Sequence, residues 1–183
     1  LISDLNDLVP IGEDGVGVGN LDNAQRYGAE INTTLNLDGL GLTGVQLEIE
    51  AEARETSVED PFTGLDRRIS GNLVSFVFAE ARWDIPKTDF AVSLGYDQFR
   101  GARRARRDEL LFGRGTPGFG FLFIEHKDLF GATGFFELGN LFNQQDRFTR
   151  DVFEPDRTGP LVLTEDRKRD FGLIYTVGIS GSF

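Results

Sequence analysis

The feature that most constrains this chain is its final stretch, 170–183, where apolar residues alternate with small or polar ones. One register is apolar at all but one position: Phe183, Gly181, Ile179, Val177, Tyr175, Leu173 and Phe171. The other register holds Ser, Gly and Thr, with Ile174 as the exception. Period-two alternation marks a strand whose two faces meet different environments. A strand that faces lipid on one side and a lumen on the other has this pattern, so we expect an outer-membrane β-barrel.

The composition excludes several function classes. The formal net charge of −11 argues against an electrostatic nucleic-acid binder, because such a protein is normally basic. The absence of cysteine rules out a disulfide framework, a thiolate nucleophile and a cysteine-ligated zinc. The single histidine, His126, has neither a metal-ligand pattern nor a Ser-His-Asp arrangement around it. We therefore expect no enzymatic activity, no metal and no cofactor.

Alternating segments recur along the whole chain. The 17 phenylalanines and 23 glycines favour strands over helices, and no apolar run reaches the roughly 18 residues of a membrane-spanning helix. The predicted strands, about eight in all, are 1–9, 27–37, 45–54, 72–84, 90–97, 118–125, 134–143 and 170–183. The predicted fold class is all-β, an antiparallel transmembrane β-barrel.

The connections between these segments alternate in length. Polar or glycine-rich stretches predict long loops at 10–23, 60–68, 101–117 and 144–168. Short turns are predicted at 38–41, 85–89 and 127–133. Outer-membrane barrels have short periplasmic turns and long extracellular loops, whereas a soluble sandwich has no reason to sort its hairpins in this way. The sorting also places the carboxyl terminus on the periplasmic side.

Four segments resemble the C-terminal barrel of TonB-dependent outer-membrane receptors. They are 20–31, 60–71 with its Asp-Pro-Phe-Thr-Gly and Arg-Arg-Ile-Ser-Gly elements, 137–143, and the closing strand. Within 137–143, the motif formed by Asn140, Leu141 and Phe142 is the most recognisable. The closing-strand pattern resembles the signal read by the barrel-assembly machinery, and it is formed by Tyr175, Val177, Ile179 and Phe183.

This resemblance implies a location and a function. Such receptors lie in the outer membrane of Gram-negative bacteria, surrounded by lipid and lipopolysaccharide. They take up scarce solutes such as ferric siderophores through a barrel of roughly 22 strands. The intact receptor also has a plug domain and a TonB box, and neither has a counterpart in this sequence. We therefore expect 1–183 to be one C-terminal barrel segment, which works with a plug domain and TonB in the intact protein.

Acidic residues share one face of two predicted neighbouring strands. Alternation predicts a lumen-facing group formed by Glu30, Asn32, Glu48, Glu50 and Glu52. The group could contact a polar solute or a plug domain, although a solvated inner face balanced by cations is the simpler interpretation. A closed eight-stranded barrel is filled by its own side chains, so the carboxylates favour a wider, wet lumen.

Arginines cluster in the predicted extracellular loop 101–117 and just before it. The cluster consists of Arg100, Arg103, Arg104, Arg106 and Arg107. It could bind an anionic ligand or the phosphates of lipopolysaccharide. The alternative is a solubilising loop in which these cations pair with Asp108 and Glu109.

The sequence therefore predicts part of an outer-membrane receptor for active nutrient uptake. One alternative is a complete, small eight-stranded barrel with a structural or adhesion role. A less favoured alternative is a soluble β-sandwich that acts as a binding module, since its apolar strand faces would need a second sheet to cover them.

Overall fold

The protein is an antiparallel β-sheet. The computed structural model describes residues 5–11, 15–21 and 24–181, with side chains from Ala24 onward except Thr116. Within these residues there is one 3-10 turn, η1 (Asp38–Leu40). The strands are β1 (Leu5–Ile11), β2 (Gly15–Leu21), β3 (Gln25–Asn36), β4 (Val45–Glu59), β5 (Asp66–Arg67), β6 (Leu73–Asp84), β7 (Phe90–Gly101), β8 (Arg104–Ala105), β9 (Glu109–Thr116), β10 (Phe119–Leu129), β11 (Ala132–Gly139), β12 (Gln145–Phe153), β13 (Leu161–Asp170) and β14 (Ile174–Ser180). The all-β prediction is confirmed.

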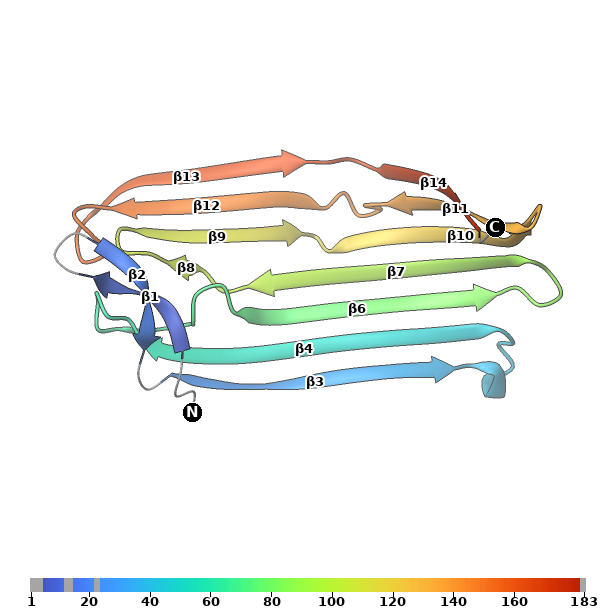
Figure 1. Cartoon of the computed structure of the whole chain (residues 1–183), viewed down its shortest axis with the longest axis horizontal. Helices are drawn as coiled ribbons and strands as arrows, with labels where there is room; N and C mark the ends of the chain where they lie inside the picture. Colours follow the sequence, from blue (N-terminus) through green and yellow to red (C-terminus); the bar gives the residue numbers. More distant parts are fainter. Residues whose placement is uncertain (1–4, 12–14, 22–23, 182–183) are drawn as a thin grey trace.

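The strands from β3 onward form one 12-stranded sheet, which Figure 1 shows as stacked, nearly parallel rows. β3, β4, β6 and β7 each make a whole row. Each of the next three rows is two strands in line: β9 with β10, β12 with β11, and β13 with β14. Each row pairs with the next one along the chain, so the sheet is an antiparallel meander. The hairpin of β1 and β2 is a separate two-stranded sheet.

The two ends of the sheet differ. The turns 37–44, 85–89 and 130–131 lie at one end, which we call the short-turn end. The connections 60–72, 102–108 and 154–160 lie at the other, the long-loop end. β14 runs toward the short-turn end (Figure 1). The predicted alternation of short and long connections is present only in part, because 37–44 has eight residues whereas 102–108 and 154–160 have seven each.

Three of the predicted long loops are largely strand instead. β2 occupies half of 10–23, β9 lies within 101–117, and β12 and β13 fill most of 144–168. β9, β12 and β13 carry polar residues in both registers, so they lack the period-two pattern that reveals a strand, whereas the repeated glycines of β2 indicated a loop. The closing segment is also divided, because 171–173 separates β13 from β14. The remaining predicted strands from β3 onward are confirmed within a few residues.

One face of the sheet is apolar over its short-turn half. Residues directly opposite each other on paired strands share a face, so the register assigns each side chain to a face. On β3, β4 and β6, Ile31 pairs with Ala51, which pairs with Val77. The exposed members of this apolar face are Tyr27, Ile31, Leu35, Val77, Trp83, Phe90, Leu94, Tyr175, Val177 and Ile179. Among the residues whose side chains are described, only five apolar residues are buried, namely Ala24, Val58, Ile69, Ala91 and Ala105, so the apolar face is not covered by a core.

The opposite face is acidic and aromatic, and we call it the acidic face. Its carboxylates are Glu30, Glu48, Glu50, Glu52, Glu80, Asp97, Glu125 and Glu137. Phenylalanine rings lie between them, and several rings rest on glycines of a neighbouring strand. A Cβ at Gly95 would lie 2.1 Å from the Phe121 ring, and one at Gly178 would lie 2.3 Å from the Phe135 ring. Each ring covers the backbone of the glycine opposite it, and a side chain at that glycine would push the ring away.

Replacing Gly95 by Ala is expected to destabilise the sheet by about 1–3 kcal/mol, because the new methyl group overlaps the Phe121 ring and forces it off its position. The change is measured as the midpoint of urea unfolding. Gly113→Ala is the matched control, since Gly113 also lies in a strand, β9, but nothing lies within 4 Å of its Cβ position. Equal midpoints for the two variants would show that ring-on-glycine packing contributes nothing.

Both lateral edges of the sheet are open within the described residues. β3 pairs only with β4, β13 only with β12, and β14 only with β11. Tyr175, Val177 and Ile179 lie on β14, opposite Leu138, Phe136 and Gly134 of β11. Phe183, the end of the predicted assembly signal, lies outside the described residues.

Candidate functional site

The predicted lumen-facing residues lie together on β3 and β4, at one lateral side of the acidic face. Glu30 pairs with Glu52, and Asn32 pairs with Glu50 and donates a hydrogen bond to its carboxylate at 3.5 Å. Glu48 lies opposite Glu80 on β6, an acidic residue that the strand prediction did not assign to a face. Arg54 forms an ion pair with Glu52. Within the part of the chain described, Glu30, Glu48, Glu50 and Glu80 have no ion-pair partner, so this face is strongly anionic.

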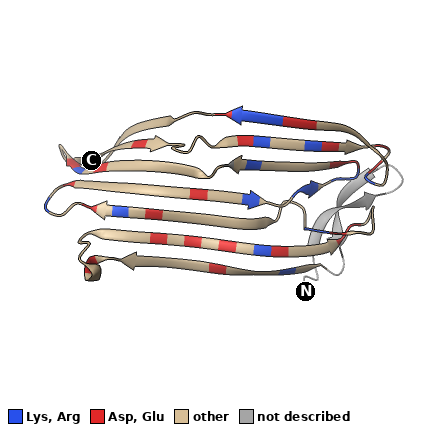
Figure 2. Ribbon diagram, turned by 180° about the vertical axis from the view of Figure 1, so that it is seen from behind, with Lys and Arg blue, Asp and Glu red and all other residues tan. Residues whose placement is uncertain are grey.

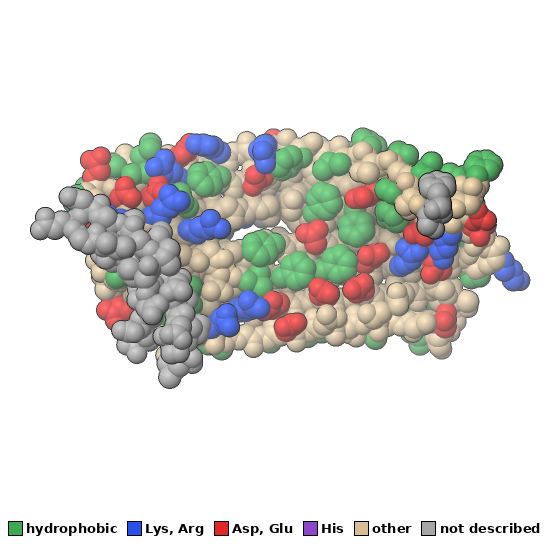
Figure 3. Space-filling view, viewed as in Figure 1, with side chains coloured by type: hydrophobic (Ala, Val, Ile, Leu, Met, Phe, Trp, Pro, Cys, Tyr) green, Lys and Arg blue, Asp and Glu red, His purple; other side chains and the backbone are tan. Residues whose placement is uncertain are grey.

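Figure 3 shows the acidic face, with red carboxylates and green rings interspersed over the middle of the sheet. Register places Phe78 opposite Glu50, and Phe123 opposite Glu137. Phe123 and Phe135 stack with their centroids 5.5 Å apart. This arrangement can contact a polar or cationic partner through the carboxylates and an apolar one through the rings.

The five predicted arginines do not form one cluster. Arg100 lies in β7 and Arg104 in β8, and the other three lie in the 102–108 connection. Arg106 pairs with Glu109 at 2.8 Å, as the solubilising alternative predicts for one of the five. Arg104 packs its side chain against Gly71. Only Arg100 and Arg103 share a surface, and cations from elsewhere in the chain complete it.

That surface holds a row of four cations on four adjacent rows of the sheet. Arg100 on β7 lies opposite Arg114 on β9, Arg114 opposite Arg147 on β12, and Arg147 opposite Lys168 on β13. We call these four residues the cationic row. Figure 2 shows lysine and arginine gathered in the long-loop halves of the same rows. Arg114, Arg147 and Lys168 were missed in the sequence because they lie far apart along it and only the register brings them into line.

Two hollows lie along the cationic row. One, of about 350 Å³, is lined by Arg68, Arg100, Gly101, Ala102, Arg103, Phe112 and Arg114. The Phe112 ring contacts two of its cations, at 5.7 Å from the Arg114 guanidinium and 6.0 Å from that of Arg103. The other, of about 390 Å³, is lined by Gln145, Arg147, Asp166 and Lys168. Like charges placed opposite each other repel, so this row is suited to an anionic partner.

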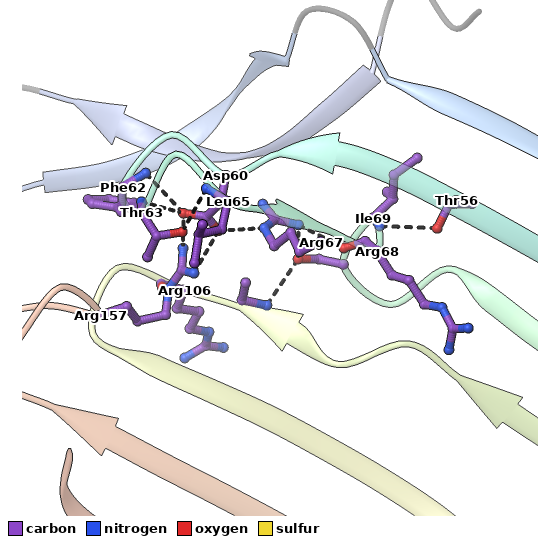
Figure 4. Close-up of polar contacts among 12 residues, drawn as sticks. Thr56, Asp60, Phe62, Thr63, Leu65, Arg67, Arg68, Ile69, Arg106 and Arg157 are labelled. Carbon is purple, nitrogen blue, oxygen red and sulfur yellow. Dashed lines mark hydrogen bonds and ion pairs between the residues drawn. The ribbon is translucent and has the colours of Figure 1, made fainter. Parts of the chain in front are cut away.

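A buried carboxylate, Asp60, joins the three connections of the long-loop end (Figure 4). Arg157, from 154–160, places Nη1 2.6 Å from Asp60 Oδ2 and donates from Nη2 to Oδ1 at 3.0 Å. Arg67 donates from Nε to Oδ2 at 2.6 Å. The amides of Phe62 and Thr63 donate to Oδ1 at 2.9 and 3.1 Å. These five residues form the Asp60 cluster.

The third connection joins the cluster through its backbone. The Arg106 carbonyl accepts a hydrogen bond from the Arg157 guanidinium, and the Arg107 carbonyl accepts one from the Arg157 amide at 3.0 Å. Burial alone would raise the pKa of Asp60, but the hydrogen bonds from Arg157, the Phe62 amide and Arg67 outweigh it and lower the pKa to about 2. The Asp60 cluster is therefore a permanently charged structural joint rather than a proton-transfer site.

The Asn140-Leu-Phe motif lies between β11 and β12, where that row of the sheet is interrupted. The Asn140 side chain is 1% exposed; its Nδ2 donates to the Gly172 carbonyl at 2.7 Å, and its Oδ1 accepts from the Gln144 amide at 2.6 Å. The Leu141 amide donates to the Gly120 carbonyl at 2.9 Å. Phe142 lies over Gly120 and meets the Tyr96 ring edge-on, with centroids 5.9 Å apart. The motif thus connects the segment between β11 and β12 to both neighbouring rows.

No family model matches the chain, and neither the curated proteins nor the solved structures include a match. Among the described residues, no group of His, Cys, Asp or Glu is arranged to hold a metal ion. In the same part of the chain, no helix is long and apolar enough to cross a membrane.

Proposed function

We propose that this chain forms part of the wall of a large outer-membrane β-barrel that takes up a scarce nutrient, as TonB-dependent receptors do. The apolar face is turned to lipid, and the acidic face is turned to a wet lumen that could hold a plug domain. Its long-loop end is extracellular and its short-turn end periplasmic. No residue is assigned a covalent chemical step.

The apolar face is the observation that carries this proposal. From Val45 to Ala53 on β4, the residues of this face are all apolar over about 27 Å of strand at ~3.4 Å per residue. At the strand tilt of outer-membrane barrels, this corresponds to about 20 Å of height. The apolar band of outer-membrane barrels is about 25 Å tall. An exposed apolar surface of this extent is a strong aggregation liability in water, whereas in a bilayer it needs no further cover.

Aromatic residues at both limits of the apolar face support the same orientation. All three tyrosines of the chain lie on this face: Tyr27, Tyr96 and Tyr175. The single tryptophan, Trp83, is also on it, at the short-turn end, and donates its indole N–H to the Thr43 carbonyl at 3.3 Å. Amphipathic rings at both interfaces of the apolar band are typical of transmembrane barrels.

The acidic face and the open edges favour a wide barrel over a closed one of eight strands. The interior of an eight-stranded barrel is filled by side chains, so carboxylates without ion pairs would be costly there. The open edges at β3 and at β13 with β14 leave room for further strands on both sides. These features support the receptor over the small adhesion barrel.

Single cysteines test the orientation directly, since the chain has none of its own. Leu65→Cys and Leu40→Cys are a matched pair, because both leucines are highly exposed, one in a long-loop connection and one in a short turn. In intact cells, a membrane-impermeant maleimide should label Cys at position 65 and should label Cys at position 40 only after the outer membrane is permeabilised.

Labelling at 40 but not at 65 in intact cells would reverse the topology and contradict the proposal. Protein that remains in solution without detergent, with both positions reacting equally, would instead support the soluble β-sandwich.

A further inference from the structure

The cationic row lies on the apolar face, beyond its long-loop limit. β7 is a regular strand over Phe90–Gly101, so Leu94, Tyr96 and Arg100 all project from the same side. The hydrogen bond from Tyr96 to Gln98, 3.4 Å long, agrees with this alternation. Arg114, Arg147 and Lys168 follow onto the same face through their cross-strand pairing. The row is therefore on the outside of the proposed barrel and not in its lumen.

The distance from the apolar face to the row suits a lipid headgroup. Arg100 lies four residues beyond Tyr96 along β7, which is about 13 Å of strand, and less when the tilt of the strand is included. The polar headgroup layer begins directly above the hydrocarbon core and is several ångströms deep on each side. Tyr96 and the exposed Phe142 mark the limit of the apolar band, so cations just beyond them reach phosphate level.

Most of these cations form no ion pair with a carboxylate. Within the described residues, Arg100, Arg103, Arg114 and Lys168 form no ion pair. Arg147 pairs with Asp166, and Arg68 donates to both oxygens of Glu55 at 2.9 and 2.7 Å. Glu55 lies opposite Tyr27, so this pair is also on the outer face. The hollows thus hold more positive than negative charge on the face that meets the membrane.

We infer that the cationic row binds the phosphates of a multiply phosphorylated lipid of the outer leaflet, which in an outer membrane is lipopolysaccharide. This inference rests on the proposed function, since it requires the apolar face to be in the bilayer. The two neighbouring hollows match a lipid with two phosphate groups, one near Arg100, Arg103 and Arg114 and one near Arg147 and Lys168. Guanidinium groups bind phosphate through paired N–H donors, which a lysine cannot do.

The acyl chains of the same lipid would lie against the apolar face below the row. That geometry distinguishes a lipid from a free anion, because the headgroup and the chains are bound by adjoining parts of one surface. The Phe112 ring makes cation–π contacts with both Arg103 and Arg114, which line the same hollow. The binding groups are therefore positioned before the lipid arrives.

The test compares two triple variants that lose the same charge. The first, Arg100→Gln with Arg114→Gln and Lys168→Gln, removes only cations without ion pairs, so it relieves repulsion and should fold normally. The control, Arg26→Gln with Lys87→Gln and Arg167→Gln, removes cations from the acidic face, the short-turn end and the far side of β13. Binding of bis-phosphorylated lipid A to the protein in detergent is measured by native mass spectrometry.

We expect the first variant to bind lipid A about 10-fold or more weakly and the control to change less than about twofold, since each charge-assisted hydrogen bond alone supports about a tenfold effect. The double variant Arg100→Lys with Arg114→Lys keeps the charge and loses the paired donors, so it should fall between the two. Dephosphorylated lipid A should bind weakly to all of them. Flotation with phosphatidylcholine vesicles measures membrane insertion separately.

Equal lipid A binding by both triple variants, with flotation intact, would overturn this inference and leave the proposed function standing. Displacement of lipid A by millimolar inorganic phosphate would also overturn it, because the row would then be a site for a free anion. Failure of the unchanged protein to float with vesicles would overturn both.

Discussion

Replacing Asp60 by Asn is expected to destabilise the long-loop end by about 3 kcal/mol. The variant keeps an oxygen for the Phe62 and Thr63 amides but removes the charge that Arg67 and Arg157 share. The Arg157 side chain is only 7% exposed in its ion pair with Asp60, so its charge would be left buried and unpaired. All three connections would loosen together, because Arg157 also binds the carbonyls of 106 and 107.

Limited trypsin digestion measures this effect, since freed connections expose cleavage sites at Arg106, Arg107 and Arg157. Fragments identified by mass spectrometry should include cuts in both 102–108 and 154–160, with the rows of the sheet intact. Asp66→Asn is the matched control, because it makes the same change at an exposed carboxylate of the same connection. Cleavage confined to 60–72 would mean that Asp60 orders only its own loop.

The same cluster predicts resistance to acid. The pKa of Asp60 is lowered in the folded protein to about 2, from an ordinary value of 3.8. A depressed carboxyl pKa contributes stability that is fully present above about 4 and is lost as the pH falls through about 2. Pepsin, which is active in this range, should therefore leave the connections of the unchanged protein intact at pH 3 but cut those of Asp60→Asn.

The sequence revealed the strands of the short-turn half because the two environments there differ most. Where one face is apolar and the other carries carboxylates, alternation is nearly strict, as in β3 and β4. In β12 and β13 both registers hold charged residues, for example Asp166 beside Arg167. Those strands are held by pairing with their neighbours, which no local pattern expresses, and they were therefore predicted as loops.

The candidate surfaces divide in the same way. The acidic group could be predicted because β3 and β4 are joined by one short turn, which fixes their register. The cationic row could not, because it depends on the register of four rows and on the irregular pairing of β7 with β9. The contact between Asp60 and Arg157 joins residues 97 positions apart, and nothing near either residue indicates the other.

The motif around Asn140 was identified by resemblance alone, and the structure gives a physical reason for asparagine at this position. Asn140 and Asn143 both have positive φ, 59° and 53°, a conformation that asparagine tolerates better than most residues. Gly172, whose carbonyl accepts from Asn140, also has positive φ, at 69°. The interruptions of two neighbouring rows are thus joined by one buried amide, which keeps β12 and β13 in line with β11 and β14.

Replacing Asn140 by Ala is accordingly expected to destabilise the sheet by about 2–4 kcal/mol. The change leaves the Gln144 amide and the Gly172 carbonyl without their hydrogen-bond partner, which costs about 1–3 kcal/mol. It also places alanine at positive φ, which costs about 1 kcal/mol. Asn143→Ala is the control, because that residue has the same backbone conformation but an exposed side chain, and it should lose only about 1 kcal/mol. Asn140→Gly isolates the contribution of the side-chain amide, since glycine tolerates the positive φ but lacks the amide. In urea unfolding, Asn140→Gly should remain well below the unchanged protein, and its full recovery would show that backbone conformation, not the buried amide, is what position 140 requires.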